Sequence, residues 1–472
     1  MATGDQGDEG VDGAVGFLRG GWLVSREEEA RPVPIGAERG PVRVAVPTEV
    51  PDSGERAEDV TPVELKPLSR NRNYTLLWVG QAFAEVGFSA SMFAFPLLVL
   101  AITGSAGAAG LVLAADAVAQ LALGLPAGAL VDRWDRRRVM LACELTQVVS
   151  IGSLVAVLVL GTATVPHMVA VAVVMGLCRA LFEPAEDASL PTLVPEEQVA
   201  TAVAMNAARS SLGQMAGNAL GGILFAVGRW VPFLLDVVTH LIAFIALAFL
   251  RMPPRPAVVA QDAHLGREIL AGLRWVWSRR EVRVTAVCAM ALNLFFSAFY
   301  LVVIVLADQR GVPSGEIGVM AAMLGVGGII GSLIAPYLHR VLSPYLSIVG
   351  VFWALTLLAP IAVLVDNGYL LGLLFAGMAL LAPTANTTIT THQLLLTPDD
   401  LRGRLGGVMG VVVGGAAALG PALGGLLVEA VSAPTAVLTS AAGMAVVTLL
   451  VTVNPTLRRY PKQDPERREV PA

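Results

Sequence analysis

The chain has 472 residues, of which 55% are hydrophobic and only 15% are charged, and its mean hydropathy is +0.69. This composition, with 48 Gly and 29 Pro, excludes a soluble helical protein and indicates an integral membrane protein. The formal net charge of -5 arises in the first 66 residues, where 14 acidic residues face 7 basic ones; the remainder is slightly basic.

Residues 1–72 are rich in Gly, Pro and acidic residues. They show neither sustained periodicity nor the basic and then apolar pattern of a signal peptide. We expect this segment to be a disordered acidic tail on the cytoplasmic side.

Twelve apolar runs follow, each of about 20 residues, which is the length that crosses a hydrocarbon core of roughly 30 Å. A transmembrane barrel would instead show alternating segments of about 10 residues. We therefore expect an all-α membrane protein with twelve transmembrane helices. The runs are 75–101, 106–130, 138–161, 165–187, 201–227, 232–251, 284–306, 316–338, 345–365, 369–391, 404–428 and 433–453.

The loop between the second and third runs, residues 131–138, holds four Arg in six residues. Positive charge beside apolar spans favours the cytoplasmic side because it resists translocation. With the amino terminus on that side, the cytoplasmic loops and span ends carry fourteen Arg, whereas the opposite loops carry only Arg229 and Arg310. We expect a multi-pass protein of the plasma membrane with both termini in the cytoplasm and no nucleic-acid partner.

The segment 252–283 divides the runs into two sets of six. It begins Met-Pro-Pro-Arg-Pro, through which no helix continues, and then places Ile269, Leu273 and two Trp among Arg. We expect a linker with an amphipathic helix on the inner membrane surface. The predicted domains are then the tail 1–72, a six-helix bundle at 73–251, the linker 252–283, a second bundle at 284–454 and a cytoplasmic tail at 455–472.

Two sequence blocks recur at an offset of 203 residues. Residues 193–197 match 396–400, and 217–224 match 420–427 with six identities in eight. Two matched blocks at one spacing indicate that the two halves are copies.

These features resemble the major facilitator superfamily over about residues 70–455. The superfamily's loop motif Gly-x-Leu-x-Asp-Arg-x-Gly-Arg-Arg is matched by Gly128, Leu130, Asp132, Arg133, Arg136 and Arg137, with Asp135 where Gly is usual. Residues 71–81, 182–185 and 397–404 are also similar to its enterobactin-exporter-like and actinobacterial drug-efflux branch, which consists largely of exporters. The resemblance implies two pseudo-symmetric six-helix bundles.

The resemblance also implies a conformational latch in the loop motif. Asp132 would cap the amino terminus of the run 404–428 when the protein faces outward, and Arg136 or Arg137 would reach carboxylates at the end of the run 165–187. The alternative is that these Arg only anchor the topology. The residues expected in the latch are Gly128, Asp132, Arg133, Arg136, Arg137, Glu183 and Asp187, with Glu186 as a further possible carboxylate.

The run 201–227 carries closely spaced small residues, which let helices approach. They resemble the antiporter signature Gly-x-x-x-Gly-Pro-x-x-Gly-Gly, and we expect either a hinge or plain close packing. Asn218 replaces the Pro, which appears instead in the duplicate as Pro421. The full set is Gly213, Gly217, Asn218, Gly221, Gly222, Gly420 and Pro421.

Ionisable residues inside spans are costly and need partners. From their depths we expect the buried ion pairs Glu85–Arg179 and Glu144–Arg209. Asp116 has no obvious cation, and an isolated carboxylate in an apolar medium tends to bind a proton. Asp116 and Glu85 are therefore the candidates for proton coupling, with packing carboxyls as the alternative, while Asp236 is expected to meet water.

The resemblance implies a substrate path along the first, fourth, seventh and tenth runs. Its polar candidates are Gln81, Asn293, Tyr300, Thr384, Asn386 and Thr387. Several Phe in the same runs would supply apolar walls, a mixture that suits a bulky amphiphile better than a sugar.

Other chemistry has no support in the sequence. There is no phosphate-binding Gly-rich loop, no metal motif and no nucleophile motif, and Cys143, Cys178 and Cys288 read as core residues without a disulfide. We expect no enzyme, cofactor or metal, and a monomer in the lipid bilayer. The predicted function is proton-coupled efflux of a small amphiphilic molecule by alternating access. An importer of the same fold, or a non-transporting receptor or scaffold, is the alternative.

Overall fold

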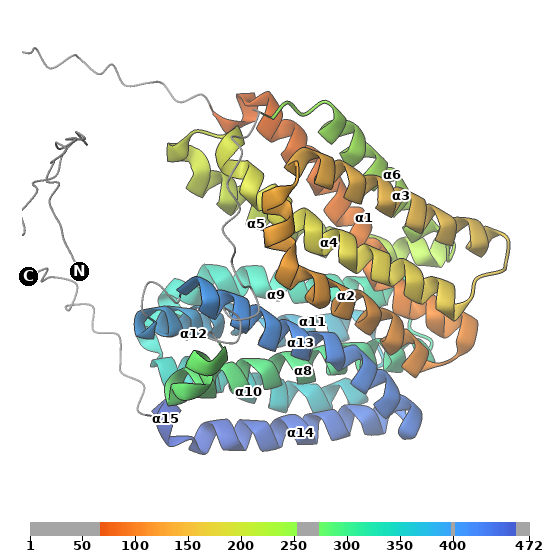
Figure 1. Cartoon of the computed structure of the whole chain (residues 1–472). Coiled ribbons are helices and arrows are strands. Elements are labelled where there is room, and N and C mark those ends of the chain that lie inside the picture. The colour runs from red at the N-terminus through yellow and green to blue at the C-terminus, as the bar shows by residue number, and fades with distance from the viewer. Residues whose placement is uncertain (1–66, 253–272, 398–401, 459–472) are drawn as a thin grey trace, which may run out of the picture. The chain divides into compact units, whose positions relative to one another are not determined.

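The computed structural model describes residues 67–252, 273–397 and 402–458, and these form helices and no strand (Figure 1). All of them belong to one unit, Leu65–Ala472. Residues 1–66 of the predicted tail lie outside the described residues. The remaining tail residues are described and include a short 3-10 helix, Leu68–Arg70, that leads into the first long helix.

Each of the twelve predicted runs coincides with a helical segment. The first half contains α1 (Arg72–Thr103), α2 (Ala106–Arg133), α3 (Arg136–Val159), α4 (Val165–Leu193), α5 (Glu196–Val227) and α6 (Val231–Ala248). The second half contains α8 (Arg280–Gln309), α9 (Ser314–Val341), α10 (Pro344–Leu358) with its 3-10 continuation Ala359–Leu364, α11 (Gly368–Ala379), α12 (Ala382–Leu396), α13 (Arg402–Ala430), α14 (Ala433–Val453) and the short α15 (Pro455–Arg458).

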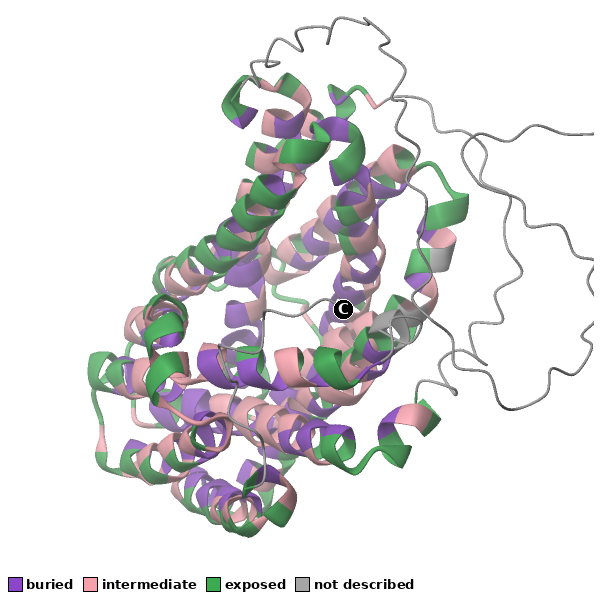
Figure 2. Ribbon diagram, turned by 90° about the vertical axis from the view of Figure 1, so that its left-hand side faces the viewer, coloured by how far each residue is buried: buried purple, intermediate pink, exposed green. Residues whose placement is uncertain are grey.

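Among the described residues, eleven segments are long and apolar enough to cross a membrane, and α5 is the helix that falls short. It carries Arg209 and several amide and hydroxyl side chains, which lower its hydropathy. The predicted all-α membrane architecture is confirmed. Figure 2 shows buried residues where helices face one another and many exposed ones on the outer faces. Large apolar side chains such as Leu364 are among the exposed residues.

The turn between α2 and α3 explains why a Gly is not needed at Asp135. The Asp135 backbone is extended, and its side chain accepts a 2.8 Å hydrogen bond from the Arg138 amide, which caps α3. A residue with this backbone has no use for the freedom of Gly at positive φ. At this position the turn is therefore capped by the Asp135 side chain.

The two halves repeat the same close helix packing. In α5, a Cβ on Gly217 would lie 2.5 Å from the Val86 carbonyl oxygen of α1. In α13, a Cβ on the equivalent Gly420 would lie 2.8 Å from the Leu294 carbonyl oxygen of α8. Gly221 and Gly424 meet Ala90 and Ala298 in the same way, so the duplication seen in sequence extends to equivalent contacts.

The halves touch each other through α2 with α13 and α5 with α9 (Figure 1). Gly425 packs on Ala106, and Gly222 packs on Ser314, both at the end remote from the Arg-rich turn. At the other end, a Cβ added to Gly128 or to Gly406 would have no atom of another element within 4 Å. The halves are thus closed together at the far end and apart beside the Arg-rich turn.

The linker is described only from Leu273 onward. A helical stretch at residues 273–278 places Val276 in a small apolar cluster with Val282 of α8 and Leu405 of α13. Its amino-terminal part, including Ile269, lies outside the described residues.

Candidate functional site

A central cavity of about 940 Å³ lies between the two halves. Its walls come from α1, α2 and α5 on one side and α8, α9 and α12 on the other. They are mostly apolar, with a few amide and hydroxyl groups and no charged side chain. The lining residues include Met92, Phe93, Pro96, Leu113, Ser211, Gln214, Met215, Asn218, Phe296, Ser297, Tyr300, Leu324 and Pro383.

The predicted substrate-path residues divide among several places. Tyr300 lines the central cavity, and Asn386 and Thr387 are exposed on the face of α12 that carries Pro383, three and four residues away. Thr384 is buried, and Asn293 donates its amide to the Ala289 carbonyl of its own helix. Gln81 lies elsewhere, in the smaller polar cavity described below.

Arg179 of α4 is the centre of one charged cluster. It lies 3.6 Å from Glu85 of α1, the pair expected from depth, and it donates a 2.7 Å hydrogen bond to Glu183 one turn further along α4. Its guanidinium also stacks 4.6 Å from the ring centre of Phe88. Asp116 forms no ion pair with a described residue, and its Oδ1 is buried without a hydrogen-bond partner among them, so its role in proton coupling stays a prediction.

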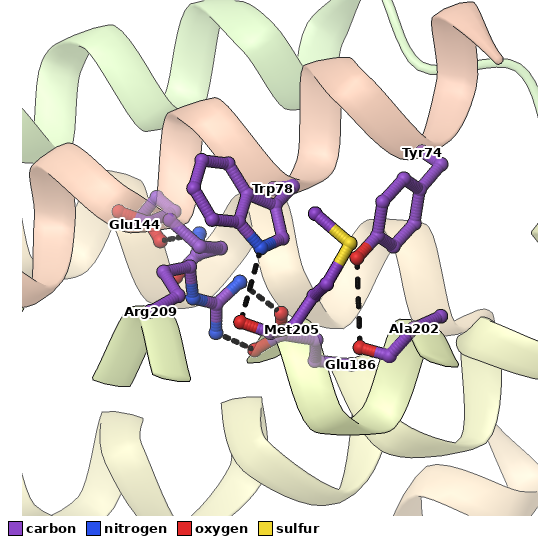
Figure 3. Close-up of polar contacts among 8 residues, drawn as sticks. Tyr74, Trp78, Glu144, Glu186, Ala202, Met205 and Arg209 are labelled. Carbon is purple, nitrogen blue, oxygen red and sulfur yellow. Dashed lines mark hydrogen bonds and ion pairs between the residues drawn. The ribbon is translucent and has the colours of Figure 1, made fainter. Parts of the chain in front are cut away.

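Arg209 of α5 does not pair with Glu144, which corrects the second predicted ion pair. Its two terminal nitrogens donate to the two oxygens of Glu186 on α4 at 2.6 and 3.0 Å (Figure 3). Beside this pair, Tyr74 and Trp78 of α1 donate to backbone carbonyls of α5. Depth alone did not distinguish Glu186 from Glu144, because it gives no information on the helix face.

Glu144 instead belongs to a buried triad with His240 and Asp236, which sequence reasoning missed. Glu144 Oε2 lies 2.6 Å from His240 Nδ1, and Glu144 Oε1 accepts a 2.8 Å hydrogen bond from the amide of Gln81. On the other side of the ring, His240 Nε2 lies 3.2 Å from Asp236 Oδ1, without hydrogen-bond geometry. The expectation that Asp236 meets water is wrong, since it is fully buried beneath Gly87 of α1.

These groups surround a polar cavity of about 310 Å³ inside the first half. Helices α1, α3, α4, α5 and α6 supply its walls. The lining residues include Gln81, Glu85, Phe88, Glu144, Gln147, Arg179, Glu183, Glu186, Asp187, Val203, Asn206, Arg209 and His240. Ala207 lines both cavities. The buried charged residues among the described ones, Glu144, Glu186, Arg209, Asp236 and His240, all belong to this half.

The Arg-rich turn lies at the separated end of the halves. Arg136 donates to the Ala188 carbonyl of α4 and lies 3.7 Å from Asp132, whose side chain is 63% exposed. Arg137 donates to the Leu247 and Ala248 carbonyls of α6 in this state, so its contact with a carboxylate of α4 in the outward-facing state stays a prediction.

The carboxylates expected in the latch are held elsewhere in this state. Glu183 pairs with Arg179 and Glu186 pairs with Arg209. The partner segment at residues 398–401 lies outside the described residues, so the Asp132 cap on α13 stays a prediction.

At the closed end, Glu429 of α13 crosses to the other half. Its Oε1 accepts hydrogen bonds from the Ser105 hydroxyl and from the Gly107 amide, the latter at 3.0 Å, at the amino terminus of α2. A carboxylate there is stabilised by the free amides and the helix dipole. This contact exists because the two halves are closed together at this end.

Comparison with known proteins gives one family match and several relatives. Residues 63–470 match a family model described as transmembrane secretion effector. The multidrug efflux pump Tap of Mycolicibacterium fortuitum is 28% identical over 367 residues, which cover 74% of this chain and 87% of that protein. The enterobactin exporter EntS of Escherichia coli O1:K1 / APEC is 27% identical over 356 residues, which cover 72% and 81%.

Solved structures share the fold. The nucleoside transporter NupG has a TM-score of 0.67 at 13% identity, covering 82% of this chain and 99% of that one. A bacterial homologue of the iron transporter ferroportin, in an inward-facing state, has a TM-score of 0.63 at 17% identity, covering 80% and 98%. Likeness at these identities concerns the fold alone.

Proposed function

Because the chain belongs to the transmembrane secretion effector family of the major facilitator superfamily, and is thus a multi-pass membrane transporter rather than an enzyme, we propose that it exports small amphiphilic molecules. The export is driven by protons and works by alternating access.

The observation that carries this proposal is the central cavity between the halves. A volume of about 940 Å³ accommodates a drug-sized molecule. Its apolar wall binds the body of an amphiphile, while Gln214, Asn218 and Tyr300 offer hydrogen bonds to its polar part. A sugar would leave many hydroxyls without partners there, at a cost for each buried group.

The efflux direction is supported by the named relatives, one a multidrug efflux pump and another an enterobactin exporter. Their cargoes indicate drugs, secondary metabolites or siderophores as the substrate class for this chain. An importer of the same fold would use the same cavity, and the direction of driven transport distinguishes the two.

The positive-inside pattern puts the Arg-rich turn in the cytoplasm. With that orientation, the separated end of the halves faces the cytoplasm, and the present arrangement is the state that accepts substrate from inside. Export then requires the halves to close at the Arg-rich turn and separate at the Ser105–Glu429 end. Glu85 and Asp116 are the carboxylates that the sequence predicted for coupling; Glu85 lies 3.6 Å from Arg179, and Asp116 Oδ1 is buried without a hydrogen-bond partner among the described residues.

Everted membrane vesicles provide the test. Ethidium, a tetracycline, a macrolide and ferric enterobactin are supplied outside, with and without an imposed pH gradient. We expect at least one probe to accumulate only when the vesicle interior is acidic. Accumulation without any gradient dependence would contradict proton coupling, and accumulation only under the reversed gradient would identify an importer.

A further inference from the structure

We propose that the buried triad of Glu144, His240 and Asp236 binds the proton that drives transport. The inference rests on the proposed proton-coupled export and assigns its ion site to residues other than Glu85 and Asp116. The triad joins α3 to α6 inside the first half, away from the central cavity.

The first argument is burial. The side chains of Glu144, His240 and Asp236 are 1%, 3% and 0% exposed, so water does not solvate their charges. One amide, from Gln81, donates to Glu144, and neither oxygen of Asp236 has a hydrogen-bond donor among the described residues. One imidazole between two buried carboxylates leaves negative charge with few hydrogen-bond donors, which is expensive in such a place, and binding a proton removes it.

The second argument is the charge count. With the imidazole protonated and both carboxylates ionised, the triad carries a net charge of −1. One further proton brings the net charge to zero: an O–H bond of a hydronium ion breaks, an O–H bond forms on either carboxylate, and a water molecule is left. The triad therefore has two states that differ by one proton. Burial away from water favours the neutral state, because a net charge in the interior is poorly solvated.

The groups around the triad do not neutralise its net negative charge. Arg209 of α5 lines the same cavity but is neutralised by Glu186. From α4 the triad faces Cys178, which contacts Cys143 of α3, and from α1 it faces Gln81, while Glu85 lies further along the cavity beside Arg179. No described group of three or more His, Cys, Asp and Glu has the arrangement of a metal site.

The third argument is access. His240 and Glu144 line the polar cavity, whose other walls include the exposed residues Glu183, Asp187 and Val203. Protons can therefore enter from the separated end of the halves. Asp236 lies four residues from His240 toward the opposite end of α6, about 6 Å along the helix. The triad thus extends from the cavity toward the closed end, as a relay between the two sides requires.

The alternative is that the triad has a purely structural role and only holds α6 against α3. Infrared difference spectra of the purified full-length protein in liposomes, recorded against pH, separate the two interpretations. We expect a protonated-carboxyl band that titrates, disappears in Glu144→Gln or Asp236→Asn, and persists in Asp116→Asn and in Glu429→Gln. A band that survives both triad substitutions, or no titrating band at all, would overturn the proposal.

Transport supplies the second arm, with ethidium as the probe in everted vesicles. We expect Glu144→Gln and His240→Gln to exchange internal for external ethidium while accumulation falls to its level without a pH gradient. Retained exchange shows that the variant is folded. Loss of gradient-driven accumulation in Asp116→Asn, with normal accumulation in the triad variants, would also overturn the proposal. If the wild type moves none of the probes, the proposed function fails, and the infrared spectra still decide whether the triad titrates.

Discussion

At the scale of single residues, the Arg209–Glu186 pair is the contact with the largest expected effect on stability. Both side chains are buried, and the bidentate geometry fixes α5 on α4. Removing one partner leaves the other as an uncompensated buried charge, which typically costs about 3–5 kcal/mol. A well-packed apolar pair in the same place avoids that cost.

We therefore expect Arg209→Ala to lower the free energy of unfolding by about 3–5 kcal/mol and the double variant Arg209→Met/Glu186→Leu to recover most of it. Denaturant unfolding in detergent measures both. Asp366→Ala is the matched control, because the Asp366 side chain in the Arg310 pair is 80% exposed and a surface pair contributes about 0–1 kcal/mol. Equal losses in the two single variants would contradict the argument.

Side-chain partners were only partly predictable from the sequence. Glu85 and Arg179 share a depth and do meet, but Glu144 and Arg209 also share a depth and do not. Depth follows from counting residues along a span, whereas the partner depends on which face of each helix points inward. His240 gave no signal in the sequence, because its role appears only when α3 and α6 bring it between Glu144 and Asp236.

At the scale of helices, the paired Gly contacts hold each half together. Gly217 seats α5 on α1 and Gly420 seats α13 on α8, each closer than a side chain permits. The positions of the helices were predictable, because each apolar run has the length of one span. Their pairing was not, apart from the repeated Gly-rich blocks, since apolarity alone does not select a neighbour.

Gly217→Ala and Gly420→Ala should each destabilise the protein by about 1–3 kcal/mol, because the added Cβ would overlap backbone carbonyls that cannot move alone. Thermal unfolding in detergent measures the effect. Gly152→Ala in α3 is the control, since its Cβ would lie 4.0 Å from the nearest neighbouring atom, Val237 Cγ2. If all three variants melt alike, close packing at these Gly is not what joins the helices.

Glu429 makes a different kind of inter-helix contact, because it ties α13 to the start of α2 across the two halves. Glu429→Gln removes the charge that the helix dipole favours. We expect the ratio of closed to open far ends to fall by roughly two- to fivefold. Spin-label distances between the far ends of α2 and α13 report the ratio, and an unchanged distance distribution in Glu429→Gln would exclude such a role.

At the scale of the whole molecule, transport needs a second arrangement in which the Arg-rich turn is closed. In the described state the Asp132 side chain is 63% exposed and lies 3.7 Å from Arg136 of its own turn. Closing that end would bring Asp132 to the amino terminus of α13.

Asp132→Asn should accordingly reduce transport while membrane abundance stays normal. Vesicle uptake and immunoblotting measure the two quantities. Asp135→Asn, two residues beyond the α2 end, should transport normally because Asn caps a helix about as well as Asp. Wild-type transport by Asp132→Asn would argue that the turn only anchors the topology.

Deleting residues 2–66 tests the scaffold alternative. A transporter keeps its flux without the acidic segment, because both cavities are built from residues beyond it. We expect uptake per molecule to remain at the full-length level. A large loss of activity in a stably inserted, truncated protein would favour a function residing in the tail.

The confinement of the described buried charges to one half has an electrical consequence. A transmembrane voltage acts on charges, at about 2.3 kcal/mol per elementary charge for roughly 100 mV, and has little hold on apolar helices. The Arg209–Glu186 pair carries no net charge, so among the described buried groups the voltage would act mainly on the Glu144–His240–Asp236 triad in its state of net charge −1. A collapse of the membrane potential would therefore remove a force on the first half that the apolar second half does not experience.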